Sequence, residues 1–327
     1  MMRKPIKIIL FSEINSLFGS SFLQDLLLHP LVAIEGLVTS VDGQLCSYYL
    51  NESVQVNLKD EALKLNIPVF QPQKINEEVI QGILKSLDAD YFLIANYQKI
   101  LKQRTIDIPK VATINFHPSL LPAYAGLAPF FWMAKQGETH SGVSAIRVNE
   151  TIDAGELVAQ IPISLQGVET ASEIREMHFN KSIELLRILL PQMIEKKLNF
   201  QAQDLSKRSY FSRPNDHDFI IDWNSSNQDI MRIIRAAYRY PGAVFVTEKF
   251  EKIVILSAES IQSYGDSQLN VCALGSIHFV NNRWLLRTRE GFIHIKTIGI
   301  GTQEIALNEQ TSLFGKELFS KEQLLVG

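Results

Sequence analysis

Cysteine is scarce in this 327-residue sequence, which contains two, Cys46 and Cys272, far apart along the chain. Disulfide-stabilised secreted domains use many more, so the pair favours a reducing compartment, and we expect a cytoplasmic protein. Neither cysteine has a second Cys or a His at metal-ligand spacing, so no metal is expected. No apolar run reaches the length of a membrane-spanning helix. Residues 1–11 predict a first strand rather than a signal peptide, because Lys7 interrupts their apolar run.

A strong net charge and a glycine-rich nucleotide loop are also missing. The net charge is −3, and the 46% hydrophobic and 20% charged residues are typical of an ordinary globular protein. No strong overall field therefore draws the chain to nucleic acid. The first expected strand-to-helix loop contains Gly19 but no Gly-x-Gly-x-x-Gly, which argues against a site for NAD.

Apolar runs alternate with helical patterns through the first two thirds of the chain. This order predicts βαβ units and an α/β fold with a Rossmann-like, mostly parallel sheet. Ser172 is the expected N-cap of the last helix. The expected strands are Ile6–Phe11, Val32–Val38, Asp90–Ala95, Gly142–Val148 and Leu157–Ile163, and the expected helices are Phe18–Leu28, Lys59–Leu65, Glu77–Leu87, Ala128–Lys135 and Ser172–Leu190.

The composition of the chain changes after Phe200. A polar stretch that contains turn-forming residues predicts a linker near residues 202–218. Beyond a helix at Asp229–Ala237, short apolar runs separated by turns predict a small β-rich barrel. We therefore expect one domain over residues 1–205 and a second over 206–327. The barrel strands are expected at Val244–Thr247, Lys252–Leu256, Gly275–Val280, Arg283–Thr288 and Phe292–Ile298.

An amide and an imidazole stand where the strand before Pro118 ends. Asn115 and His117 are two residues apart, so in an extended chain they point to the same face. Ligands of open parallel sheets bind at the carboxyl ends of the strands, and these two groups could bind an oxygen and move a proton. Taken alone, Asn-x-His is more often a turn cap and a structural histidine, and Asp153 in Thr151–Gly155 is ordinary turn chemistry.

Four motifs in order change that balance. Asn-x-His-Pro-Ser-Leu-Leu-Pro from Asn115 is followed by Tyr124-Ala-Gly126, by a Gly-x-x-x-x-Gly-Val ending at Val143, and by Asp153-Ala-Gly155. This series resembles the folate-dependent formyltransferases, which include methionyl-tRNA formyltransferase, glycinamide ribonucleotide formyltransferase and sugar N-formyltransferases. The segments Ile221-Asp-Trp223, Ile234-Arg-Ala236 and Pro241-Gly-Ala243 resemble the oligonucleotide-binding-like C-terminal domain of the methionyl-tRNA formyltransferase group. The resemblance covers nearly the whole chain.

The resemblance implies an enzyme that transfers a formyl group from the co-substrate 10-formyltetrahydrofolate to a primary amine, without a metal. It assigns catalysis to Asn115, His117 and Asp153. It places the folate against the loop after the fourth strand, the proline motif and the aspartate turn. The implied folate-binding residues are Asn96, Tyr97, Ile100, Leu101, Ser119, Leu120, Leu121, Pro122, Ile152 and Gly155.

These three polar groups suit the chemistry of formyl transfer. Attack of a neutral amine on the formyl carbonyl creates an oxyanion, and the amine must lose a proton. Asn115 can donate its amide N–H to the oxyanion. His117 can stabilise the same charge as an imidazolium or take the proton as an imidazole. Asp153 can fix the tautomer of His117 or relay the proton through water, and no Ser or Cys nucleophile is required.

The acceptor is constrained by missing basic residues. The tRNA enzyme usually has a basic loop after its second strand and Tyr-Arg-Gly after the proline motif. Here Thr39–Leu58 contains no Lys or Arg, and Ala125 replaces the arginine. Residues 219–327 hold eleven Lys and Arg against eleven Asp and Glu. Arg232, Arg235 and Arg239 recur at helical spacing, which we interpret as a solvated helix face rather than a basic RNA-binding face.

The sequence therefore favours a small-molecule amine, such as a nucleotide-linked amino sugar, with initiator methionyl-tRNA as the alternative partner. A catalytically inert folate-fold module that uses its barrel for binding is the alternative of another class. The joint presence of Asn115, His117 and Asp153 argues against an inert module. No membrane partner is expected, and the oligomeric state stays open.

Overall fold

The computed structural model describes residues 4–49, 54–239, 241–246, 252–261, 272–300 and 303–308. The chain divides into two compact units. Unit 1 consists of Met1–Pro129, His140–Ser164 and Arg175–Phe211. Unit 2 combines the chain from Ser212 onward with two shorter segments, Phe130–Thr139 and Leu165–Ile174, that interrupt unit 1 in the sequence.

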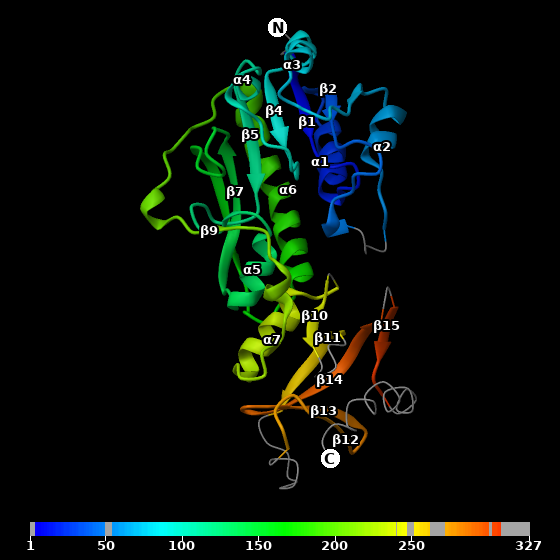
Figure 1. Cartoon of the computed structure of the whole chain (residues 1–327). Helices are drawn as coiled ribbons and strands as arrows, with labels where there is room; N and C mark the ends of the chain where they lie inside the picture. Colours follow the sequence, from blue (N-terminus) through cyan, green and yellow to red (C-terminus); the bar gives the residue numbers. More distant parts are fainter. Residues whose placement is uncertain are drawn as a thin grey trace. The chain divides into compact units, whose positions relative to one another are not determined.

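Unit 1 is built on a seven-stranded sheet with the strand order β3-β2-β1-β4-β5-β7-β8 (Figure 1). The pairs from β3 to β5 are parallel, whereas β7 and β8 add antiparallel to that edge. The predicted α/β fold with a mostly parallel sheet is thus confirmed. The strands are β1 Ile6–Phe11, β2 Val32–Val38, β3 Val69–Phe70, β4 Tyr91–Ile94, β5 Ala112–His117, β7 His140–Arg147 and β8 Leu157–Ser164.

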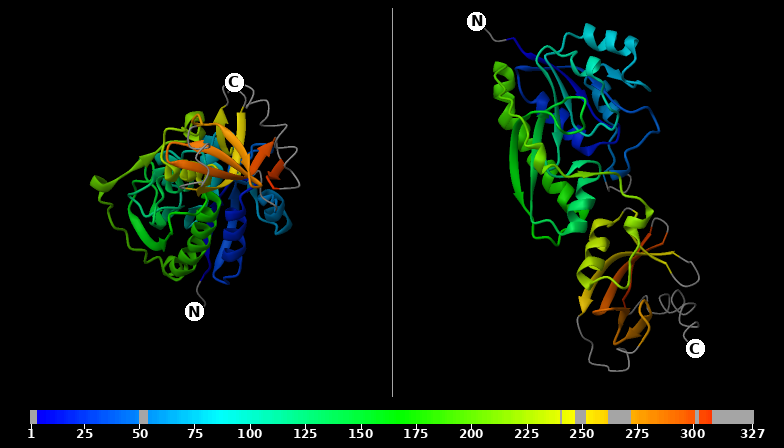
Figure 2. Two further views of the ribbon diagram at one scale, coloured as in Figure 1. Left: turned by 90° about the horizontal axis from the view of Figure 1, so that it is seen from below. Right: turned by 60° about the vertical axis from the view of Figure 1, so that its left-hand side comes forward.

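Helices cover both faces of this sheet, because its central strands are apolar on both sides. On one face, α1 (Leu17–Leu27) lies beside α6 (Ala171–Glu195), with the rings of Phe18 and Phe179 stacked at 4.5 Å (Figure 2, left view). On the other face, α3 (Glu78–Ser86) and α4 (Gln103–Ile106) contribute Leu84 and Ile106 to a buried cluster with Phe92 of β4. The short α2 (Leu58–Lys64) and the 3-10 turn η1 (Ser47–Tyr49) complete this half.

The start of α6 differs from the prediction. Ser172 was expected to be the N-cap, but it lies inside the helix. The Thr170 hydroxyl accepts from the Glu173 N–H at 3.3 Å, and the Glu173 carboxylate accepts from the Thr170 N–H at 2.7 Å. This reciprocal capping box gives hydrogen-bond acceptors to two backbone N–H groups, those of Thr170 and Glu173. The helix also continues through Pro191 to Glu195, beyond its expected end.

Unit 2 is β-rich, as predicted. Its antiparallel sheet has the order β10-β11-β14-β13-β12, and β15 pairs with the end of β14. The helix α7 (Asn227–Ala236) packs Ile230 and Ile234 into the core on which Trp284 also lies. The expected Thr247 lies outside the described residues, and β15 was not expected. The strands are β10 Ala243–Val246, β11 Lys252–Ile261, β12 Ile277–Val280, β13 Arg283–Thr288, β14 Gly291–Ile300 and β15 Gln303–Ala306.

The expected linker near residues 202–218 contains short structured pieces. The 3-10 turns η2 (Leu205–Lys207) and η3 (Asp216–Phe219) flank β9 (Tyr210–Phe211). Strand β9 pairs in parallel with β6 (Ala125–Gly126), and the chain leaves unit 1 after this pair. The helix α5 (Pro129–Gln136) follows β6. None of the helices in the described ranges is both long enough and apolar enough to cross a membrane.

An ion pair between the buried Asp90 and the exposed Lys196 joins the start of β4 to the end of α6. Asp90 accepts from the Lys196 ammonium at 2.6 Å and from the Lys7 N–H at 2.9 Å, and its side chain is 8% exposed. Burial by itself would raise the pKa of Asp90, but the Lys196 and Lys7 donors together hold that pKa below its usual value. The ionised carboxylate therefore stabilises the fold above its unfolded-state pKa, and this contribution is lost as the pH falls through the folded-state pKa.

We expect Lys196→Met to lower the free energy of unfolding at pH 7 by about 1–2 kcal/mol, because the carboxylate of Asp90 loses a charged donor. Since Asp90 is protonated at low pH, the difference from the parent should shrink as the pH drops below about 4. Urea unfolding across this pH range measures both effects. Lys197→Met is the matched control, because Lys197 and its partner Glu195 are largely exposed. An equal loss in the two variants would contradict the role of Asp90.

Candidate active site

His117 and Asp153 meet at the end of β5. The Nδ1 atom of His117 lies 3.6 Å from Oδ1 of Asp153, and the two side chains are 7% and 10% exposed. The other ring nitrogen, Nε2, lies 2.9 Å from the carbonyl oxygen of Tyr124. The strand ends here because Pro118 cannot donate to a sheet ladder. An imidazole and a carboxylate separated by 36 residues in sequence are thus brought into contact.

The Tyr124 carbonyl determines which ring nitrogen of His117 carries the hydrogen in the neutral ring. A carbonyl oxygen accepts hydrogen bonds and cannot donate, so Nε2 of His117 carries a hydrogen. The nitrogen that gains or loses a proton is therefore Nδ1, which faces Asp153. A proton on Nδ1 would lie next to Oδ1 of Asp153, at the 3.6 Å contact. The arrangement can accept a proton at one defined atom.

The turn that carries Asp153 is held from two sides. Asp153 lies in the left-handed backbone region, with φ of 53°, and its Oδ2 accepts from the Gly126 N–H at 2.9 Å. The Gln203 amide donates to the carbonyl oxygens of Asp153 and Gly155, at 3.0 and 2.6 Å. Gln203 was assigned to a linker by its polar surroundings, and no sequence signal identified it as a positioning residue.

Asn115 differs from the other polar groups in having no partner. It shares the face of β5 with His117, two residues away, and its side chain is partly exposed. Its amide makes no hydrogen bond with any residue in the described part of the chain, so its N–H groups remain available to a ligand. Asn96, by contrast, already donates to the Ser16 hydroxyl at 3.2 Å and to the Tyr49 hydroxyl at 3.5 Å. Asn115 is therefore available to a ligand, whereas the amide of Asn96 holds neighbouring side chains together.

The proline motif is fixed by two buried hydroxyl groups. Ser119 donates to the Ala123 carbonyl at 2.7 Å, so its hydroxyl holds the loop together. Ser144 of β7 donates to the Ser119 carbonyl at 2.6 Å and accepts from the Leu121 N–H at 3.0 Å. Gln160 of β8 donates to the Ser144 hydroxyl and to the Leu121 carbonyl. Ser144 and Gln160 were not expected to have this role, because the sequence pattern of a strand does not show which loop its polar side chains contact.

The loop expected to bind folate combines packing with open backbone groups. Tyr97 packs edge-on against Phe11 at 5.5 Å, and burial raises the pKa of its hydroxyl. This hydroxyl has no hydrogen-bond partner in the described part of the chain. Ile100 is 65% exposed, whereas the Leu101 side chain is buried. The backbone N–H and C=O of Leu101 bond to no group in the described ranges. A flat heterocycle with amide-like edges requires such groups beside an apolar wall, so this loop fits a pterin ring.

The other expected folate contacts in the proline motif are partly structural. The Leu120 side chain lies against Gly142, where an added Cβ would approach it to within 2.6 Å. Leu121 is 3% exposed and belongs to a small apolar cluster. The Pro122 carbonyl accepts from the Ser209 N–H at 3.2 Å. The side chains of Leu120 and Pro122 are partly exposed, whereas that of Leu121 is buried.

The two expected folate contacts in the aspartate turn, Ile152 and Gly155, differ in exposure. Ile152 is 42% exposed, and its carbonyl accepts from Arg208 at 2.8 Å. Gly155 is buried, and a Cβ there would lie 1.7 Å from the carbonyl oxygen of Arg147. Gly155 therefore allows two backbone segments to touch, and this contact sets the position of Asp153. Among the described residues, no group of three His, Cys, Asp or Glu side chains is placed to hold a metal ion.

The comparisons with known proteins agree with this geometry. Residues 33–187 match the Formyl transferase family, and residues 215–310 match its C-terminal domain. Methionyl-tRNA formyltransferase of Chlamydia caviae is 31% identical over 226 residues, covering 69% of this chain and 70% of that protein. The bifunctional polymyxin resistance protein ArnA of Wigglesworthia glossinidia brevipalpis is 33% identical over 211 residues, which are 64% of this chain and 32% of ArnA. The chain thus spans about a third of that relative.

A solved structure shows the same fold at lower identity. The N-formyltransferase of Helicobacter canadensis, in complex with folinic acid and dTDP-3-aminofucose, superposes with a TM-score of 0.62 at 18% identity, covering 89% of this chain and 98% of that one. The resemblance read from the four sequence motifs is confirmed by the family matches. The chain belongs to the folate-dependent formyl transferase family and contains both domains of that family.

Proposed function

We propose that this chain transfers a formyl group from 10-formyltetrahydrofolate to a primary amine of a small molecule, such as a nucleotide-linked amino sugar. The observation that carries the proposal is the contact of His117 Nδ1 with Asp153, on the strand where the amide of Asn115 is unpartnered. Catalytic roles for these three residues, and folate contacts at positions 96, 97, 100, 101, 119–122, 152 and 155, are part of the proposal.

The donor supplies an activated formyl carbonyl, and the side chains stabilise the oxyanion and transfer the proton. Asn115 donates an N–H to the formyl oxygen as that oxygen gains negative charge on attack by the amine. His117 takes the proton that the amine nitrogen loses when the new C–N bond forms, and Nδ1 is the atom that receives it. Asp153 stabilises the resulting imidazolium. Return of this proton to the folate nitrogen lets the old C–N bond break, and the products are the formamide and tetrahydrofolate.

Three sequence features support a small-molecule acceptor. Thr39–Leu58 lacks Lys and Arg, Ala125 stands where the tRNA enzyme has arginine, and residues 219–327 carry balanced charge. A transfer RNA is a polyanion, and its binding depends on several Lys and Arg contacts to phosphates. The Helicobacter canadensis relative was solved with a nucleotide-linked amino sugar. Methionyl-tRNA remains the second candidate, because relatives of that name are 28–32% identical to this chain and are matched over 66–84% of their own length.

Transfer assays with one donor separate the candidates. We would incubate the protein with 10-formyltetrahydrofolate and follow tetrahydrofolate release with a panel of amino-sugar nucleotides and with initiator methionyl-tRNA. Saturable release with a sugar nucleotide supports the proposal. Saturable release with the tRNA alone would assign the second function. No release with any acceptor would favour an inert folate-fold module.

A further inference from the structure

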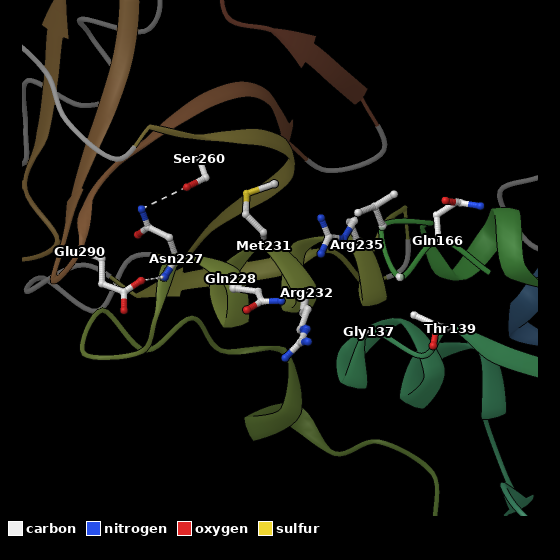
Figure 3. Close-up of a pocket in the computed structure, with 12 residues that line it drawn as sticks. Gly137, Thr139, Gln166, Asn227, Gln228, Met231, Arg232, Arg235, Ser260 and Glu290 are labelled. Carbon is white, nitrogen blue, oxygen red and sulfur yellow. Dashed lines mark hydrogen bonds between the residues drawn. The ribbon is translucent and has the colours of Figure 1, made fainter.

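Unit 2 contains a pocket that the formyl-transfer chemistry does not use. Its volume is about 960 Å³, within the range of small-molecule sites. It lies along α7 and is bordered by the segments 137–139 and 166–168, which belong to the same unit. In Figure 3, Arg232 and Arg235 project from α7 toward Gly137, Thr139 and Gln166. Asn227, Ser260 and Glu290 form the opposite end.

The two ends of the pocket differ in how well their polar groups are satisfied. At one end, Asn227 donates its side-chain amide to Ser260 at 3.2 Å and its backbone N–H to Glu290 at 3.0 Å. At the other end, the side-chain amides of Gln166 and Gln228 bond to nothing within the described ranges. Donor capacity without acceptors is therefore concentrated around the two arginines.

The arginines themselves are incompletely paired. Arg232 has one acceptor, Asp229, at 3.2 Å, and its Nε is buried without a hydrogen bond. The Arg235 side chain makes no hydrogen bond or ion pair with the described residues, and its Nε is also buried. The earlier interpretation of these residues as a solvated helix face is therefore wrong for Arg235. Arg239 lies beyond the helix, where it pairs with Glu304 at 3.3 Å.

The electrostatics favour an anion beside Arg235. Burial and the neighbouring charge of Arg232 lower the pKa of Arg235, and Glu169 offsets this only in part. Arg235 is partly buried, and removing a charge from water without giving it a partner is costly. An anion between two guanidinium groups that repel each other stabilises both. Guanidinium groups bind the oxygens of phosphate in a bidentate manner. The chemistry of this end therefore matches a phosphate group.

Gly137 keeps room for one of these cations. A Cβ at Gly137 would lie 2.6 Å from Nε and 2.9 Å from Nη2 of Arg232. The residue also has φ of 65°, which a side chain disfavours. The α5 terminus is thus shaped so that the guanidinium of Arg232 can lie flat against the backbone.

We propose that this pocket binds a phosphate-bearing small molecule, held by the guanidinium groups of Arg232 and Arg235 with the amides of Gln166 and Gln228 as further donors. The balanced charge of residues 219–327 favours a small molecule over RNA, which needs an extended basic surface. The pocket is independent of the folate chemistry, so its test needs neither donor nor acceptor.

Inorganic pyrophosphate is the test ligand, and isothermal titration of the full chain measures its binding. We expect one saturable site, and Arg235→Gln and Arg232→Gln should each weaken it at least about tenfold, as loss of one charge-assisted contact does. Arg283→Gln, which removes an exposed arginine outside the pocket, should bind like the parent. Pyrophosphate should raise the unfolding temperature of the parent and of Arg283→Gln, but not of Arg235→Gln.

Unchanged affinity in Arg235→Gln, or no saturable site in the parent, would overturn the proposal. If Arg235→Gln fails to fold, Arg232→Gln and Arg235→Lys test the proposal instead. Arg235→Lys should bind pyrophosphate with intermediate affinity, because lysine keeps the positive charge but cannot donate two parallel hydrogen bonds as a guanidinium does. A short oligoribonucleotide is the second arm. Its displacement of pyrophosphate, in a manner that requires Arg235, would assign the pocket to RNA and reject the small molecule. A failure here leaves formyl transfer untouched, because His117 plays no part in it.

Discussion

A His117→Ala variant is expected to fold like the parent and to transfer formyl groups about a hundred- to ten-thousand-fold more slowly, the usual effect of losing a general acid–base group. The reason is the geometry of the ring. Nε2 is held by the Tyr124 carbonyl, so Nδ1 beside Asp153 is the atom that can take the proton. The measurement is the steady-state rate of tetrahydrofolate release at saturating donor and acceptor.

His117→Gln is the companion variant, because an amide can still donate to the Tyr124 carbonyl but cannot take a proton. It should be as slow as His117→Ala and should unfold at a temperature closer to that of the parent. Asn115→Ala removes a different group, the donor to the oxyanion, and should cost about a hundredfold or more in kcat. Full activity of His117→Ala with 10-formyltetrahydrofolate would reject the proposed mechanism.

The sequence predicted unit 1 well because its signals are local. Alternating apolar runs and helical periods follow directly from burial on a two-sided sheet, and β1 and β2 were placed at their observed bounds. One difference from the prediction is local: Thr170 and Glu173 have the spacing of a capping box, and this box, rather than Ser172, caps the helix. The other differences depend on distant partners. The segments 130–139 and 165–174 pack with unit 2 although unit 1 surrounds them in the sequence.

The candidate site shows the same division. The two-residue spacing at a strand end made Asn115 and His117 candidates, and the motif series then favoured a catalytic role for them and for Asp153. Gln203 could not be found, because its amide acts on two carbonyls about 50 residues earlier. The arginines of α7 were assigned to solvent, because their spacing defines a helix face but not what covers that face. The covering segments come from around residues 137 and 167, far away along the chain.

Gly155→Ala is expected to abolish most of the activity and to destabilise the protein, although it adds a single methyl group. The new Cβ would lie 1.7 Å from the Arg147 carbonyl oxygen, a distance that neither backbone segment can tolerate. The turn must move, and Asp153, two residues away, moves with it. Displacement of a catalytic group by about 1 Å can cost about a hundredfold in rate. We therefore expect kcat to fall at least that far, with an unfolding free energy lower by about 1–3 kcal/mol.

Gly82→Ala in α3 is the matched control, because a Cβ there meets nothing within 4 Å. Alanine is the better helix former, so this variant should be more stable than the parent by about 0.5–1 kcal/mol, with unchanged kcat. The same chemical change should thus have opposite signs at the two positions. If Gly155→Ala keeps both the activity and the stability of the parent, the close approach at Gly155 does not position Asp153. A loss of stability with full activity would restrict Gly155 to a structural role, because the turn could then shift without disturbing the carboxylate at His117.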